Sequence, residues 1–472
     1  MLFNSLTFVV FFALIVGLHH LPLPWTLKKL NLLTASYFFY AAWNPPFVVL
    51  LWISSAVDWI VTQRMVATRT PVARKAWLIV SLVLNLGFLG FFKYAGFITE
   101  NFAALLSVFG IAYHPPAFDI LLPVGISFYT FQSLSYTIDV YRGTILPWPS
   151  FLDFALSVAF FPHMNAGPIV RSSYLLPQFA GPRQATRDQM SWGLCLVLFG
   201  LFAKMIADTV AAPVADGVYA AASRAGFTDA WVGTLAFSSQ IYLDFSGYSL
   251  CAIGTALCLG FALPENFRMP YAAIGFSDFW RRWHISLSTW LRDYLYIPLG
   301  GSRGTEARTY VNLMLTMLLG GLWHGASWTF VVWGGLHGLY LAVERWLREK
   351  TGVAGDPASA WSRLALALVT YALVNLTWVF FRAEDFTGAA RILAGMAGLA
   401  EGAAPVLPTM FVVKVVVIVT AIVATQWFMR NRSLEAVVAR APWWLTGLVT
   451  AAMLFAVTIT QGSGQAFIYF QF

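Results

Sequence analysis

Residues 313–340 read LMLTMLLGGLWHGASWTFVVWGGLHGLY, and this stretch decides the class of fold. It contains no Lys, Arg, Asp or Glu, and about 20 mostly apolar residues are enough for a helix to cross a bilayer. His324 stands in its middle, between Trp323 and Gly325. An ionisable side chain at membrane depth is costly, so it marks a candidate functional site. Imidazole is also the side chain best suited to proton transfer near neutral pH.

The rest of the chain has the same character. Of its 472 residues, 59% are hydrophobic and 11% are charged, whereas a soluble domain carries about 25% charged residues. Repeated apolar stretches predict an all-α polytopic transmembrane bundle of about ten to twelve spans. Residues 151–170 are interrupted by proline and glycine, which predicts a re-entrant segment enclosed by protein. Polar segments are short, so we expect one membrane-embedded domain over residues 1–472.

The net charge of +8 does not indicate a nucleic-acid partner. Lys and Arg gather in short loops such as 63–76, which has four basic residues and no acidic one. This is the pattern of loops that stay in the cytoplasm. The sequence has no Gly-rich phosphate loop ending in Lys-Ser or Lys-Thr, no Cys/His metal spacing and no Gly-x-Ser-x-Gly motif. We therefore expect neither a metal nor a tightly bound cofactor.

A second histidine, His284, lies in the sequence RRWHISLSTW at residues 281–290. It is either an anchor at the membrane interface or a second polar group in a cavity shared with His324. The preceding Arg281 and Arg282 would attract an anionic substrate, such as a phosphate-bearing donor. An ordinary cytoplasmic loop explains the two arginines equally well.

Asp244 is a carboxylate within another apolar run, and it needs a partner or water there. An ion pair with an arginine is the simplest expectation. Together with Arg281, Arg282 and Trp323, it is also a candidate for contact with the substrate or donor. His337 shares the apolar stretch of His324, but about 220° of rotation would separate the two on a continuous helix. We therefore expect His337 to be structural.

These motifs resemble the membrane-bound O-acyltransferases. The resemblance is to the bacterial branch that contains the alginate and peptidoglycan O-acetylation proteins and the teichoic-acid D-alanylation protein. The longest matching stretch is 279–301, which ends in WLRDYLYIPLGG. The other matching stretches are residues 122–131, 161–163, 166–168, 242–249, 319–325, 380–384 and 467–472. The resemblance covers nearly the whole chain.

The resemblance implies a mechanism in a tunnel enclosed by the helices. The invariant histidine of the family corresponds to His324, and its second polar position corresponds to His284. His324 would act as general base toward an acceptor hydroxyl that attacks a thioester carbonyl, while His284 would position or polarise the reactants. A covalent acyl-His324 relay stays open. Acetyl-CoA is the implied donor substrate, with the arginine-rich segment 264–308 near its phosphates.

The resemblance also implies a cellular setting. The protein would be a multi-pass protein of the bacterial cell inner membrane that passes an acetyl group across the lipid bilayer for O-acetylation of an extracytoplasmic polysaccharide. An extracytoplasmic acyltransferase partner would complete the transfer, docking on outward loops and the aromatic stretch 467–472. Three alternatives stay open: transfer of D-alanyl or another acyl group from a carrier protein, a non-enzymatic transporter, and a structural subunit of a secretion complex.

Overall fold

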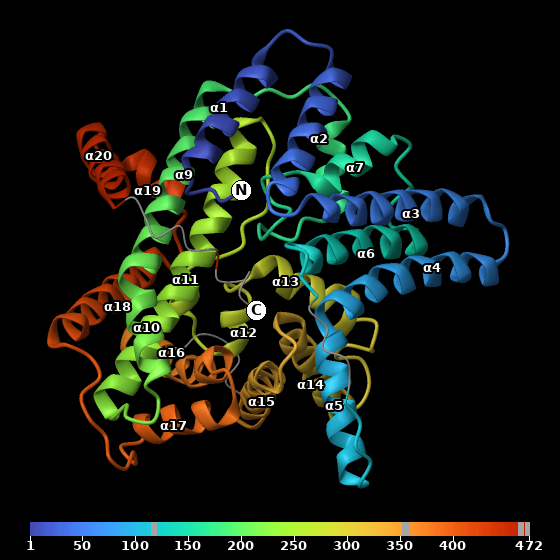
Figure 1. Cartoon of the computed structure of the whole chain (residues 1–472). Coiled ribbons are helices and arrows are strands. Elements are labelled where there is room, and N and C mark those ends of the chain that lie inside the picture. Colours follow the sequence, from blue (N-terminus) through green and yellow to red (C-terminus); the bar gives the residue numbers. More distant parts are fainter. Residues whose placement is uncertain (115–119, 352–358, 461–466, 468–472) are drawn as a thin grey trace. The chain divides into compact units, whose positions relative to one another are not determined.

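The computed structural model describes residues 1–114, 120–351, 359–460 and 467. Over these residues the regular secondary structure is helical, and no strand occurs among them. This confirms the prediction of an all-α protein. Figure 1 shows the helices coloured along the chain.

The chain packs as two compact units, and it enters each of them twice. Unit 1 comprises Met1–Val197 and Cys251–Pro264, and unit 2 comprises Leu198–Leu250 and Glu265–Phe472. Two long helices, α9 (Arg187–Ile206) and α11 (Phe227–Cys258), contribute residues to both units. The expectation of one domain over residues 1–472 stays a prediction.

Unit 1 contains the remaining helices of the first part of the chain. These are α1 (Leu6–His20), α2 (Trp25–Ala41), η1 (Pro45–Phe47), α3 (Val48–Ala67), α4 (Pro71–Leu89), η2 (Gly90–Tyr94), α5 (Ala95–Val108), α6 (Ile126–Arg142), α7 (Phe151–Ala159) and α8 (Ser172–Phe179). Helices α3, α4 and α6 lie side by side (Figure 1). They bury Asp58, whose carboxylate accepts hydrogen bonds from Ser81 at 2.6 Å and Asn85 at 3.0 Å.

The segment predicted to be re-entrant, 151–170, also lies in unit 1. Its helical part is α7, which ends at Ala159, and the chain continues as a buried loop through 160–170. The side chains of Asp153 and Lys29 form a buried ion pair at the start of this segment. The segment is thus enclosed by protein, as predicted, while its position in a membrane stays a prediction.

Unit 2 contains the helices that follow α9. These are η3 (Ala207–Ala211), α10 (Ala212–Ala220), η4 (Pro270–Ala272), α12 (Phe276–Trp280), α13 (Ile285–Leu291), η5 (Arg292–Tyr296), α14 (Glu306–His324), α15 (Trp328–Thr351), α16 (Ala360–Arg382), α17 (Phe386–Met396), α18 (Thr409–Met429), α19 (Leu434–Arg440) and α20 (Trp443–Ile459).

Six helical stretches among the described residues are long and apolar enough to cross a membrane. They are Pro45–Ala67, Pro71–Val108, Arg187–Ala220, Phe227–Cys258, Ala360–Arg382 and Thr409–Met429. The protein is therefore a multi-pass membrane protein, although fewer helices meet this standard than the ten to twelve spans predicted. The stretch 313–340 explains part of the difference. It is divided between α14 and α15, and the charged residues at the outer end of each helix reduce its apolar length.

Candidate active site

Helices α14 and α15 form a tight hairpin that determines where His324 lies. His324 is the last residue of α14, and Gly325 continues with an extended backbone. A Cβ atom on Gly321 would come within 2.3 Å of the Phe330 carbonyl oxygen, and one on Gly334 within 2.2 Å of the Met317 carbonyl oxygen. The two helices can approach this closely only because both positions are glycine.

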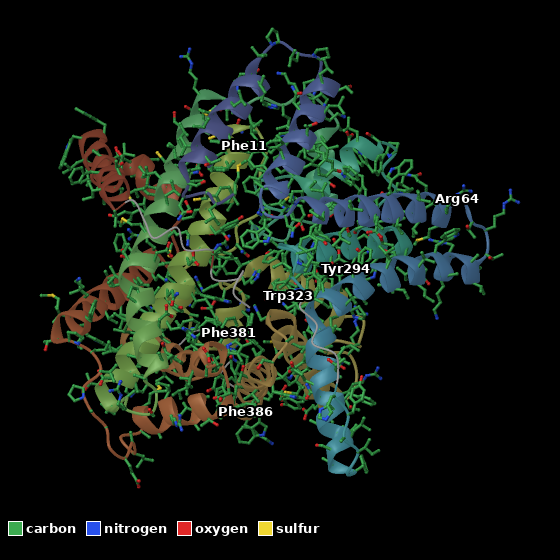
Figure 2. All side chains as sticks on the ribbon, in the orientation of Figure 1. Phe11, Arg64, Tyr294, Trp323, Phe381 and Phe386 are labelled. Atoms are coloured by element: carbon green, nitrogen blue, oxygen red, sulfur yellow. The ribbon has the colours of Figure 1, made fainter. Side chains whose placement is uncertain are left out.

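The hairpin encloses the His324 imidazole in aromatic rings. Its ring centroid lies 5.0 Å from that of Trp333, 5.0 Å from Trp323 and 5.3 Å from Phe381 on α16. Only 3% of His324 is exposed. Figure 2 shows Trp323 and Phe381 in the interior of unit 2. The histidine predicted from the Trp-His-Gly triplet is therefore buried within unit 2.

His284 reaches the same place from a strained turn. It is the residue before α13 and has φ +43° and ψ 54°, the left-handed conformation that residues other than glycine rarely adopt. Neighbouring backbone hydrogen bonds hold this turn: the Ile285 amide donates to the Asn266 carbonyl at 2.9 Å, and the Arg268 amide donates to the Arg282 carbonyl at 2.9 Å. Backbone strain of this kind gathers at functional sites, where the surrounding structure maintains it.

The two histidines that the sequence paired are neighbours in the structure. Their ring centroids are 6.4 Å apart, and the Trp323 ring lies 6.0 Å from His284. His284 is fully buried. The expected proximity is confirmed. That both line a tunnel stays a prediction, as do the roles assigned to them.

Asn266 determines which nitrogen of His284 carries a proton. The Asn266 side-chain oxygen accepts hydrogen bonds from the Ser286 backbone amide at 3.3 Å and from the Ser286 hydroxyl at 2.9 Å, and its NH₂ group donates to the Ser249 hydroxyl at 3.1 Å. The same oxygen lies 3.2 Å from His284 Nδ1. Because the oxygen can only accept, Nδ1 is the protonated nitrogen of the neutral ring, and Nε2 carries the lone pair.

Burial lowers the pKa of His284 to about 3, although a backbone hydrogen bond opposes the shift. A buried imidazolium would lack the hydration that stabilises its charge, so the neutral ring is strongly favoured. His284 is therefore a hydrogen-bond acceptor at Nε2 and a weak base at neutral pH.

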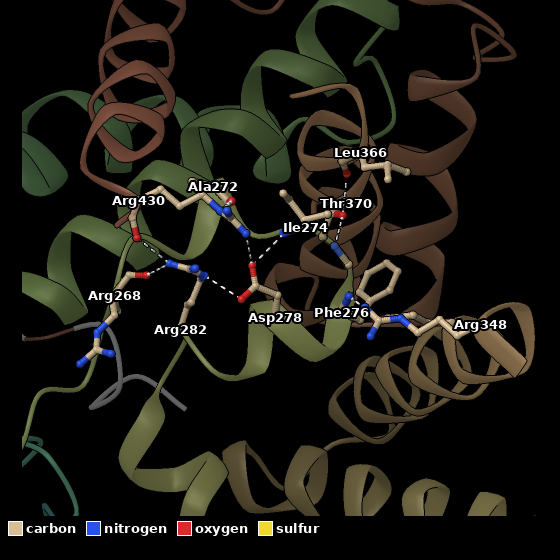
Figure 3. A network of polar contacts seen from close by, with 12 residues as sticks. Arg268, Ala272, Ile274, Phe276, Asp278, Arg282, Arg348, Leu366, Thr370 and Arg430 are labelled. Atoms are coloured by element: carbon tan, nitrogen blue, oxygen red, sulfur yellow. Dashed lines mark hydrogen bonds and ion pairs between the residues drawn. The ribbon is translucent and has the colours of Figure 1, made fainter. Parts of the chain in front are cut away.

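The paired arginines lie in different environments. Arg281 is exposed, whereas the Arg282 guanidinium donates to Asp278 at 2.9 Å and to the Arg430 carbonyl at 3.0 Å. Arg430 in turn donates to the other Asp278 oxygen at 3.0 Å. Figure 3 shows this network. Arg282 therefore contributes to a structural ion-pair network that fixes the segment before His284.

Asp244 is buried on α11 and forms an ion pair with Lys204 at 2.9 Å. The sequence suggested an arginine as its partner, and the structure places a lysine from α9 there. Lys204 also pairs with Asp208 at 3.1 Å. A lysine was not obvious from the sequence because it lies in an apolar stretch far from Asp244 along the chain.

His337 is linked to the site through Trp333. Its ring centroid lies 4.8 Å from Trp333, whose indole also contacts His324. His337 Nε2 lies 3.0 Å from the Thr377 hydroxyl, which donates to the Val374 carbonyl, so Nε2 is the donor in that contact. The rotation argument failed to detect this link because α14 and α15 are separate helices.

The sequence-based prediction did not place two residues at this site. Asn266 was one polar residue in a charged segment, and only the folded backbone brings it to His284. Phe467 is fully buried, with its ring centroid 5.5 Å from Phe245, whose ring is 4.7 Å from that of His284. The aromatic stretch 467–472 was a signal for a role, but we expected a docking surface. Its other residues, 468–472, lie outside the described part of the chain.

Comparisons with known proteins show the family of this chain. A family model described as MBOAT, membrane-bound O-acyltransferase family, matches residues 145–354. The chain is 46% identical over 400 residues to the probable alginate O-acetylase AlgI of Azotobacter vinelandii, an alignment that covers 84% of this chain and 78% of that protein. The chain belongs to the membrane-bound O-acyltransferase family. It is therefore an acyltransferase, and the resemblance noted in its motifs is confirmed.

Other relatives of this O-acyltransferase are named for different activities. The chain is 39% identical over 400 residues to the peptidoglycan O-acetyltransferase of Helicobacter pylori, covering 79% of this chain and 74% of that protein. It is 26% identical over 294 residues to the teichoic acid D-alanyltransferase of Bacillus subtilis, covering 58% and 72%. Within the described ranges, no group of three His, Cys, Asp or Glu side chains is placed to hold a metal ion.

Proposed function

We propose that this O-acyltransferase takes an acetyl group from cytoplasmic acetyl-CoA and passes it across the bacterial inner membrane for O-acetylation of an extracytoplasmic polysaccharide. The observation that carries the proposal is the buried pair of imidazoles, 6.4 Å apart, in a chain that shares 46% identity with an alginate O-acetylase. The high identity to two O-acetylating relatives favours acetyl over D-alanyl as the transferred group.

His324 is the proposed general base. Burial lowers the pKa of His284 to about 3, which makes it a weak base at neutral pH and favours His324 for this role. His324 would accept the proton of an acceptor hydroxyl as its oxygen attacks the thioester carbonyl. The tetrahedral intermediate then collapses, the C–S bond breaks, and the thiolate takes the proton from the His324 imidazolium. The Nε2 lone pair of His284 would accept a hydrogen bond from the same hydroxyl and orient it.

The other residues predicted to contact the substrate or donor lie in different environments, which favour different roles for them. Trp323 lies beside both imidazoles, so we propose that it borders the acyl group. Arg281 is exposed and stays a proposed donor contact. Arg282 and Asp244 are held in protein ion pairs, which favours structural roles for them. An extracytoplasmic acyltransferase partner is proposed because a polymer would not thread its hydroxyls easily into a buried site.

The decisive experiment uses purified protein in liposomes with acetyl-CoA radiolabelled in the acetyl group. We expect label to pass to a soluble acceptor hydroxyl on the opposite side, at a rate that depends on the protein. Transfer from a D-alanyl carrier protein but not from acetyl-CoA would replace the proposed donor. Transport of intact acetyl-CoA without cleavage of its thioester would contradict the proposed reaction. Pull-down from native membranes then tests the partner.

A further inference from the structure

A cavity of about 380 Å³ lies in unit 2, beside the charged end of α15. Its lining residues come from four elements of the chain: Ser277 on α12, Tyr296 on η5, Leu313 on α14, and Leu341, Arg345, Arg348 and Glu349 on α15. Two guanidinium groups, one carboxylate, two hydroxyl groups and an aromatic ring thus line one space together with two leucines. None of these residues was among the site predictions from the sequence.

Both arginines keep donors available at the cavity. Arg345 forms an ion pair with Glu349, at 2.8 Å through Nε, and Arg348 forms one with Glu344, at 2.6 Å through Nη2. A guanidinium has five N–H donors, so each ion pair engages only part of the group. Glu344 is also occupied by the backbone amides of Phe276 and Ser277, at 2.6 and 2.9 Å. Figure 3 shows Arg348 beside the start of α12.

This combination suits a phosphate-bearing ligand. Arginine presents a planar fork of donors that matches phosphate oxygens, and charge-assisted hydrogen bonds of this kind are the stronger ones. The Ser277 hydroxyl lies in the same wall, and the Tyr296 ring offers a stacking surface, while the Tyr296 hydroxyl is hydrogen-bonded to the Ser302 hydroxyl at 2.8 Å. The carboxylates keep the cavity close to neutral when empty, so selectivity would come from the shape of the site rather than from net charge.

The position of the cavity relates it to the histidines. On α15, Arg348 lies about three turns from His337 and on nearly the same face, a separation of roughly 17 Å along the axis. His337 contacts Trp333, which contacts His324. On α12, Ser277 lines the cavity while the Trp280 ring packs 5.2 Å from His337. A ligand that is bound in this cavity and also reaches His324 would therefore need a long, narrow chain between its two ends.

We propose that this cavity binds the phosphate end of the thioester donor, with Arg345 and Arg348 as the phosphate ligands. This proposal rests on the proposed function and deepens it, since the acyl end would extend from the cavity toward His324. The charged end of α15, with Arg345, Arg348 and Lys350, also has the character of a cytoplasmic boundary, which is where a cytoplasmic donor arrives. An anionic lipid headgroup shares the phosphate chemistry, and the test separates the two sources.

The test compares two donors on the same variants. Acetyl-CoA carries phosphates, and S-acetylpantetheine has the same thioester arm without them. In Arg345→Gln and Arg348→Gln, we expect the KM for acetyl-CoA to rise about tenfold each, the loss typical of one charge-assisted hydrogen bond. The KM for S-acetylpantetheine should not change, and kcat should stay within about twofold for both donors. Arg440→Gln, an exposed arginine on α19, is the matched control.

Other outcomes would overturn the proposal. An equal change with both donors would make the arginines structural, and no change with either would remove the cavity from donor binding. A loss of activation by phosphatidylglycerol vesicles, with the KM for acetyl-CoA unchanged, would assign the site to a lipid headgroup.

A second measurement uses the wild-type protein and no variant. CoA should protect Arg345 and Arg348, but not Arg440, from phenylglyoxal, as read by peptide mass spectrometry. Equal modification of all three with and without CoA would refute the site. This readout needs no turnover. If acetyl-CoA is not a substrate but CoA still protects, the proposed reaction fails and the site survives.

Discussion

Unit 2 contains two polar clusters, one around Asp278 and one around His284 and His324. Asp278 and His284 are close in sequence, but the polar groups around them have different kinds of partner. Around Asp278, every charge meets a partner: both carboxylate oxygens accept from arginines, and Arg282 and Arg430 also donate to backbone carbonyls. Around His284 and His324, two buried imidazoles lie near each other among aromatic rings. The first pattern fixes the chain in place, and the second buries two imidazoles that we propose carry out the chemistry. On that proposal, a structural network and part of the reactive site share one segment of the chain.

The largest effect should come from the second cluster. We expect His324→Ala to lower the rate of acetyl transfer by about 10²–10⁴, because that is the usual contribution of a positioned general base. The protein should insert normally and stay monodisperse in detergent. Transfer of radiolabelled acetyl in liposomes measures the effect, with exposed His114→Ala in unit 1 as the matched control. A wild-type rate of acetyl transfer in the His324 variant would show that His324 is not the general base.

The first cluster should respond in stability rather than in turnover. Asp278→Asn would leave the guanidinium groups of Arg282 and Arg430 half-buried without their carboxylate, and we expect a loss of about 3–5 kcal/mol in the free energy of unfolding. The fraction that remains folded should keep nearly normal kcat. Arg268→Gln is the control, since its ion pair with Glu265 is exposed and should contribute less than about 1 kcal/mol. Denaturant unfolding in detergent measures the stability of both variants. Equal losses of stability in Asp278→Asn and Arg268→Gln would contradict the structural role of the Asp278 cluster.

Asn266 is a structural residue that should also affect the reaction, because its side chain contacts His284. Asn266→Ala removes the acceptor that holds His284 Nδ1 as a donor. Losing a buried hydrogen bond costs about 1–3 kcal/mol, so we expect kcat to fall roughly five- to a hundredfold. Ser249→Ala, which removes only the contact on the far side of Asn266, should have a smaller effect. Equal kcat losses in the two variants would mean that the ring tautomer does not matter.

The sequence was sufficient for the class of fold and for the central histidines. A long uncharged run predicts buried helices, and a histidine within it has few structural explanations, so His324 and His284 could be found without coordinates. Their neighbours could not be found. Asn266 and Lys204 act through tertiary contacts with residues far along the chain, and a polar residue alone does not show which partner it meets.

The arginine pair shows a second limit. Arg281 and Arg282 are identical in type and adjacent, so a sequence argument must treat them alike. On the short helical turn that follows Phe276, adjacent side chains point in different directions, and only Arg282 faces Asp278. Likewise, the close packing of the two helices within 313–340 depends on the contact of Gly321 with Phe330 and Gly334, and the sequence shows no sign of that contact beyond the glycines themselves.

The smallest predicted effect is a dependence of stability on pH. The His284 cluster and the Asp278 cluster should lose stability in different pH ranges. The folded-state pKa of His284 is lowered to about 3, while the unfolded ring titrates near 6.5. Below pH 6.5 the unfolded chain therefore binds a proton that the folded protein excludes, and stability falls as the pH drops toward 3. Burial alone would raise the pKa of Asp278, but the Ile274 amide and the two arginines lower it below its ordinary value of 3.8. Its contribution is complete above pH 3.8 and is lost only as the pH falls through the folded-state value.

Between pH 7.5 and 5.5 the two clusters should therefore behave differently. In wild-type protein we expect a loss of about 1.4 kcal/mol for each full pH unit below 6.5 from His284 alone. His284→Gln should flatten this slope, whereas Asp278→Asn should lower stability by the same amount at both pH values. Denaturant midpoints in detergent at the two pH values measure the slope. A wild-type slope that persists in His284→Gln would show that another buried group titrates there, and it would remove the argument that His284 is too weak a base to replace His324.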